Sequence, residues 1–80
     1  MKLEILTPES GIFSGEVSLV SLPGTRGTFE ILQNHAPIIS TLEAGSVKVI
    51  DAAGRKHVFQ IKGGVVECVD NQIHLLVTIA

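Results

Sequence analysis

Residues 24–45 decide the fold of this chain, and they read Gly-Thr-Arg-Gly-Thr-Phe-Glu-Ile-Leu-Gln-Asn-His-Ala-Pro-Ile-Ile-Ser-Thr-Leu-Glu-Ala-Gly. A tip bounded by Gly24 and Gly27 comes first, and residues 28–32 then read as a short strand. Pro37 fixes its own φ and keeps the preceding residue out of the helical region. Asn34 and the residues after it therefore indicate a capped single turn and not a true helix. The last part of the stretch runs to a second break at Gly45.

Alternating apolar residues predict strands on both sides of this stretch. Gly15 falls inside the second of these strands and predicts a bulge or bend there. Gly54 can take positive φ in one hairpin turn, and Asp70 and Asn71 tolerate the left-handed backbone of another. Breaks are expected at residues 7–11, at Pro23-Gly24 and at Gly63-Gly64. The expected strands span residues 1–5, 12–22, 46–51, 55–62, 65–69 and 73–79.

Composition favours an all-β fold. Val and Ile are abundant, and their branched side chains pack well on a pleated sheet but lose rotamer freedom in a helix. The chain is 45% hydrophobic with three Phe and no Trp or Tyr, so its core must be aliphatic. Strands recur every 8 to 12 residues or so, without a helical period. We expect one domain over residues 1–80, a flattened β-sandwich or barrel of about eight to ten short, mostly antiparallel strands.

Charge and cysteine content exclude several classes of protein. A net charge of -2 with no basic cluster gives no footprint for nucleic acid. The single cysteine, Cys68, makes no internal disulfide and fits a reducing compartment. Residues 1–7 lack the apolar run of an ordinary signal peptide. No apolar stretch approaches the roughly 20 residues that span a bilayer, so we expect no direct membrane insertion.

No catalytic, metal or cofactor site can be nominated from the residues. His35 has two readings, a corner residue that forms a hydrogen bond or a ligand-binding group, and the first is the commoner role. Cys68 reads as a buried small hydrophobe because no positive neighbour would activate its thiol. His35, His57 and His74 lack the short spacing of metal ligands. The apolar residues in both phases of 17–22 and 75–77 fit either sandwich interior or a partner-binding patch.

The central stretch resembles the N-terminal β-sandwich domain of the epsilon subunit of F-type ATP synthases. Matching segments outside it are Phe13-Ser14-Gly15 and the block from Gly63 to Glu67. Glu30 and Gln33 depart from the family, which commonly has Gly and Pro at these two positions. The matching residues of the central stretch are Gly27, Phe29, Ile31, Leu32, His35, Ala36, Pro37, Leu42 and Gly45.

The resemblance implies a non-catalytic central-stalk subunit of the rotor, which links the gamma subunit to the c-ring and couples proton translocation to ATP synthesis. It implies no cofactor and a peripheral position on the cytoplasmic face of the bacterial inner membrane. Because the chain stops at Ala80, we expect a short form without the family's C-terminal helical hairpin. The residues implied to contact the polar loops of the c-ring are Arg26, Gly27 and Thr28, and those implied to contact gamma are Asn34, His35, Ala36, Pro37 and Ser40.

A rival function remains open. A small β-sandwich enzyme or ligand-binding module would place its pocket near His35. A pocket with His35 beside an acidic side chain would favour this rival, whereas a shallow apolar face would favour the stalk subunit.

Overall fold

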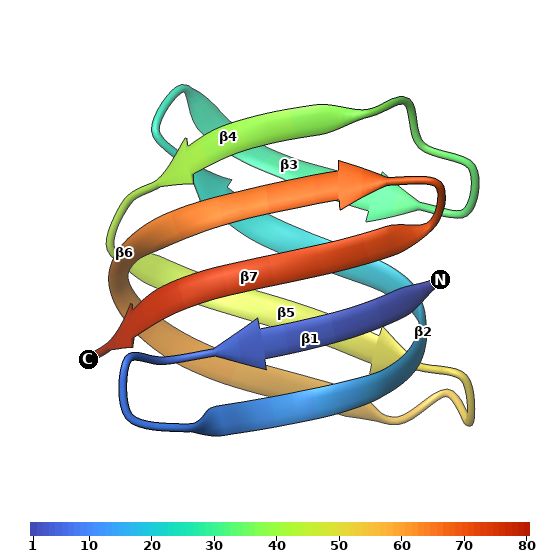
Figure 1. The fold of residues 1–80 in the computed structure, drawn as a ribbon, viewed down its shortest axis with the longest axis horizontal. Coiled ribbons are helices and arrows are strands. Elements are labelled where there is room, and N and C mark those ends of the chain that lie inside the picture. The colour runs from blue at the N-terminus through green and yellow to red at the C-terminus, as the bar shows by residue number, and fades with distance from the viewer.

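The structure is a computed structural model that describes residues 1–80, and it contains seven strands and no helix (Figure 1). It therefore has no helix long and apolar enough to cross a bilayer. The all-β prediction is confirmed. All strand pairs are antiparallel except β1 with β7, which run parallel. The strands are β1 (Lys2–Leu6), β2 (Gly11–Gly24), β3 (Gly27–Leu32), β4 (Ile38–Leu42), β5 (Gly45–Asp51), β6 (Lys56–Val69) and β7 (Gln72–Ile79).

Two long strands, β2 and β6, pass from one layer of the sandwich to the other (Figure 1). The first part of β2 pairs with β1, and its second part pairs with β5 and β3. The first part of β6 pairs with β5, and its second part pairs with β4 and β7. One layer thus consists of β4, β6, β7, β1 and the start of β2, and the other of β3, β2, β5 and the start of β6.

Three details of the predicted strands are wrong. The chain has seven strands and not eight to ten, and β6 continues through Gly63-Gly64, where the sequence predicts a break between two strands. Gly15 pairs regularly with Leu3, whereas one register shift of β2 falls at Ile12, opposite Ile5 and Leu6. The others lie between Val17 and Leu19 of β2 and between Ile61 and Gly63 of β6. These last two fall where each strand changes partners, because an extra residue bends a strand and increases its twist. The segment after Pro37, which we did not predict as a strand, forms β4.

The core is aliphatic, as composition predicts. It contains 16 buried hydrophobic residues, and none of them is aromatic. Alternation places them on the inner side of each strand, for example at Leu3 and Ile5 of β1 and at Ile73, Leu75 and Val77 of β7. Small branched side chains fill the space between the layers closely, so the two layers form one rigid unit.

The three phenylalanines lie at the two sides of the sandwich, where strands of different layers face each other without pairing. At one side the starts of β2 and β6 meet without pairing, and Phe13 packs edge-on against Phe59 and His57 with ring centroids 6.1 and 5.2 Å apart. At the other side β3 and β4 face each other without pairing, and Phe29 is the one aromatic ring present. The second side is therefore less completely filled than the first.

Candidate functional site

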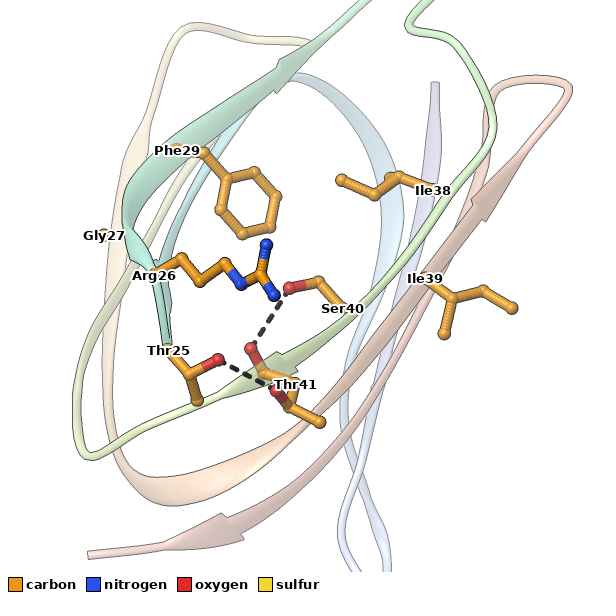
Figure 2. Close-up of a pocket in the computed structure, with 8 residues that line it drawn as sticks. All are labelled: Thr25, Arg26, Gly27, Phe29, Ile38, Ile39, Ser40 and Thr41. Carbon is orange, nitrogen blue, oxygen red and sulfur yellow. Dashed lines mark hydrogen bonds between the residues drawn. The ribbon is translucent and has the colours of Figure 1, made fainter.

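The incompletely filled side holds the one pocket of the molecule, a hollow of about 420 Å³ between β3 and β4. We call it the β3–β4 hollow. Figure 2 shows Phe29 and Ile38 on opposite walls, with the side chain of Arg26 extending below the Phe29 ring toward Ser40. The lining residues are Thr25, Arg26, Gly27, Phe29, Ile38, Ile39, Ser40 and Thr41.

Two glycines build the tip that carries Arg26. Gly24 pairs with Gly27 across the two-residue turn Thr25-Arg26, as the sequence predicts for a glycine-bounded tip. Gly27 has φ of +126°, a conformation that residues with a side chain rarely adopt. A Cβ at Gly24 would lie 2.7 Å from the Gly27 carbonyl oxygen and 2.8 Å from the Phe29 ring. Glycine at position 24 therefore lets Phe29 lie against the end of β2 as a wall of the hollow.

Hydrogen bonds close one end of the hollow. The Thr25 amide donates to the Thr41 carbonyl at 3.2 Å, and the two threonine hydroxyls lie 2.9 Å apart in a hydrogen bond of their own. The Ser40 hydroxyl donates to the Thr41 carbonyl at 3.1 Å (Figure 2). The hollow therefore combines apolar walls with three hydroxyl groups and one guanidinium.

The structure separates the predicted partner contacts into two places. Arg26 and Gly27, predicted to contact the c-ring, line the hollow, and the exposed Thr28 follows them on β3. Ser40, predicted as a gamma contact, lines the same hollow, half-buried on the inner side of β4. The other predicted gamma contacts, residues 34–37, lie at the opposite end of β3 and β4, in the connection between these strands (Figure 1).

The corner at residues 34–37 is held by side-chain hydrogen bonds. Asn34 has φ of +66°, so it is a left-handed turn residue and not the cap of a helical turn. Its amide donates to Asn71 Oδ1 at 2.7 Å, and Asn71 Nδ2 donates to Asn34 Oδ1 at 3.1 Å. His35 Nδ1 lies 2.7 Å from the Ala36 carbonyl oxygen. His35 thus forms the corner hydrogen bond of its first reading, and it belongs to none of the ion pairs.

The outer side of β4, β6, β7 and β1, the strands in front in Figure 1, carries exposed apolar side chains beside the ion pair of His74 with Glu4. Leu6 pairs with Leu76, and Leu76 pairs with Val65, so these side chains form a continuous row across three strands. Ile39 on β4 is 74% exposed and stands opposite Glu67, which in turn pairs with His74. We call this surface the β4–β6–β7–β1 face. The sequence shows apolar residues in both phases around Leu76, but it does not show that the fold places them on the same side of the sheet as Leu6 and Ile39.

The remaining titratable groups have structural partners. Asp51 Oδ1 accepts hydrogen bonds from the amides of Ala53 and Arg55, and Oδ2 lies 2.9 Å from His57 Nε2. The hydrogen bond to His57, together with those from the two amides, lowers the pKa of the Asp51 carboxyl. The Cys68 side chain is buried, as predicted, and desolvation raises the pKa of its thiol. No group of three or more His, Cys, Asp or Glu side chains could hold a metal ion.

A family model described as the β-sandwich domain of the ATP synthase delta/epsilon chain matches residues 1–80. The chain belongs to this family. The ATP synthase epsilon chain of Chlorobium limicola is 41% identical over 75 residues, covering 94% of this chain and 85% of that protein. The epsilon chain of Caulobacter vibrioides is 47% identical over 64 residues, covering 80% of this chain and 73% of that protein. The resemblance noted in the sequence is confirmed.

Solved structures confirm the fold independently. A chain in the Euglena gracilis mitochondrial ATP synthase, in a structure of OSCP, F1 and the c-ring, superposes with a TM-score of 0.87. The two sequences are 21% identical, and the match covers 94% of this chain and 48% of that one. At this identity the likeness establishes the β-sandwich of the family and nothing about individual contacts.

Proposed function

We propose that this chain is a non-catalytic rotor subunit of an F-type ATP synthase that connects the gamma subunit to the c-ring and couples proton translocation to ATP synthesis. In this proposal it is peripheral, on the cytoplasmic face of the bacterial inner membrane, and requires no cofactor. The observation that carries the proposal is the combination, on one rigid sandwich, of a face with exposed apolar side chains and a hollow beside the Arg26 tip, which adjoin at Ile39. A connector between two proteins needs two such surfaces.

Gamma is assigned to the β4–β6–β7–β1 face. Exposed leucine, isoleucine and valine side chains that adjoin across several strands are typical of a permanent protein interface. The predicted gamma contacts at residues 34–37 border this face, because Asn34 is bonded to Asn71 in the turn between β6 and β7. Ser40 points to the hollow instead, and we therefore assign it to the other partner.

The c-ring is assigned to the tip of Arg26, Gly27 and Thr28. The tip projects beyond the strands that it joins, and its backbone is fixed by the Gly24–Gly27 pair and by the bond from Thr25 to Thr41. A fixed polar tip loses little conformational entropy when it meets another polar loop. The rival function, with a pocket at His35, receives no such support because His35 does not line the hollow.

Two matched variants test the assignment of gamma. Leu76→Glu places a charge in the middle of the apolar row, where the side chain is 53% exposed, so the free chain need not bury the new charge. Val58→Glu makes a similar change at a residue that is 49% exposed on the outer side of the other layer. We expect Leu76→Glu to weaken binding to purified gamma by at least about thirtyfold, because a charge would be buried without a partner.

The control Val58→Glu should bind gamma within about twofold of wild type. Equal losses in both variants would contradict the assigned face. If the wild-type chain co-purifies with neither gamma nor the c-ring, or if membranes without the chain couple ATP hydrolysis to proton pumping normally, the proposed function itself is wrong.

A further inference from the structure

We propose that the β3–β4 hollow is a receptor for the side-chain carboxylate of an aspartate or glutamate on an acidic loop of the partner that meets the tip. This inference deepens the proposed function and rests on it for the identity of the partner, which would be a loop of the c-ring. The carboxylate would bind between the Arg26 guanidinium and the threonine hydroxyls at the closed end of the hollow (Figure 2).

The charge of the hollow favours an anion. Arg26 is the only charged residue that lines the hollow, and it takes part in none of the three ion pairs of the chain. Its guanidinium is a planar fork whose N–H groups match the two oxygens of a carboxylate. An anion that entered the hollow would therefore meet one cation and no competing carboxylate.

The threonine hydroxyls at the end of the hollow hold an unused hydrogen-bond donor. Thr25 and Thr41 share one hydroxyl–hydroxyl bond, so one of their two hydroxyl hydrogens is not used in it. Neither hydroxyl has another partner within the chain. The Ser40 hydroxyl is occupied by the Thr41 carbonyl, which fixes it at the rim. A carboxylate oxygen can therefore accept the free threonine hydrogen while the other oxygen accepts from Arg26.

The volume and the walls of the hollow suit a carboxylate side chain. A volume of about 420 Å³ exceeds a single carboxylate side chain and lies in the range of sites that enclose a ligand. The apolar walls of Phe29 and Ile38 lower the local dielectric on two sides of the hollow and strengthen an ion pair formed there. The hollow thus has room for the side chain and for part of the loop that carries it.

The net charge of the whole chain is -2, so long-range electrostatics do not speed its association with an acidic partner. The ion pair would form only at contact, inside the hollow. Loss of Arg26 should accordingly raise the dissociation rate more than it lowers the association rate.

The first experiment measures binding of the full chain to the purified c-ring. We expect Arg26→Glu to weaken binding by about tenfold or more and Arg26→Lys by a smaller factor, because an ammonium cannot form the two parallel bonds of a guanidinium. Arg55→Glu is the matched control, because it makes the same charge change in the turn between β5 and β6. It should stay within about twofold of wild type. If Arg26→Glu binds the ring as wild type does, or Arg55→Glu loses as much, the inference is wrong while the proposed function stands.

The second experiment needs no c-ring. Acetyl-Gly-Asp-Gly-amide is titrated into the labelled chain, and the amide signals of Thr25, Gly27, Ser40 and Thr41 are followed by NMR. We expect shifts that saturate with the aspartate peptide, and that are absent with the asparagine analogue and in Arg26→Gln. Saturation with the peptide but no binding of the wild-type chain to the ring would keep the receptor and refute the c-ring partner. No shift with the aspartate peptide, or equal shifts with both peptides, would overturn the inference.

Discussion

Replacement of Gly24 by alanine tests how the hollow is built. The new Cβ would lie 2.7 Å from the Gly27 carbonyl oxygen, about 0.7 Å short of the 3.4 Å at which ordinary contact begins, and 2.8 Å from the Phe29 ring. The ring can swing into the hollow, but the carbonyl belongs to the hairpin backbone and moves only with the tip. Overpacking of this kind costs about 1–3 kcal/mol. The reduced freedom of the unfolded chain returns about 0.4–1 kcal/mol.

We therefore expect Gly24→Ala to lower the free energy of unfolding by about 1–2 kcal/mol. Urea denaturation followed by circular dichroism measures it, and with a slope of about 1 kcal/mol/M the midpoint should fall by about 1–2 M. Gly15→Ala is the control, because a Cβ there meets nothing closer than the Phe13 ring at 3.9 Å. Its stability should equal that of wild type or exceed it slightly.

A double mutant separates the two clashes. In the Gly24→Ala background, Phe29→Leu removes the ring contact and leaves the contact with the Gly27 carbonyl. Recovery of stability relative to Phe29→Leu alone would assign the cost to the ring. If Gly24→Ala is as stable as Gly15→Ala, the close approach that we assign to Gly24 does not limit the fold, and the explanation for the position of Phe29 fails.

Three further predictions concern groups away from the hollow. Asp51→Asn should lower the free energy of unfolding at neutral pH, because folding lowers the pKa of Asp51 below its ordinary 3.8. The advantage of wild type should be complete above pH 3.8 and disappear as the pH falls through the lower pKa of the folded state. Urea titrations of both proteins at several pH values would measure it. Asn71→Ala should cost about 1 kcal/mol more than Asn71→Gly in the same assay, because alanine is strained at the observed φ of +60° while both variants lose the bonds to Asn34. Alkylation of Cys68 by iodoacetamide should be at least about a hundredfold slower in the folded chain than in urea, because the buried thiol, with its raised pKa, reacts only when the sheet opens; equal rates would contradict its burial.

The sequence predicts what depends on local pattern. Alternation identifies the inner residues of β1 and β7, and the turns at Gly54 and at Asp70-Asn71 have the positive φ that their residue types favour. The residue pattern does not predict where a strand continues while it changes partner strands. Gly63-Gly64 resembles a break in the sequence, yet a Cβ on Gly64 would strike the Leu76 carbonyl, so Gly64 permits close pairing of β6 with β7.

The hollow could not be predicted for a related reason. Its residues come from two segments, the tip at 25–29 and the strand at 38–41, and the sequence does not show that they face each other without pairing. The resemblance to the family supplied Arg26 and Ser40 as contact residues but assigned them to different partners. Only the three-dimensional arrangement brings them into one hollow.

The placement of the three phenylalanines explains why the hollow exists on this side of the sandwich. An aliphatic core of small branched side chains sets a close spacing between the layers, so large rings fit best at the sides, where the sheets separate. Two rings and His57 fill one side, and Phe29 alone stands at the other. The unfilled volume therefore opens beside the tip that Gly24 and Gly27 hold in place, and the cation of Arg26 is positioned there by the same packing that stabilises the fold.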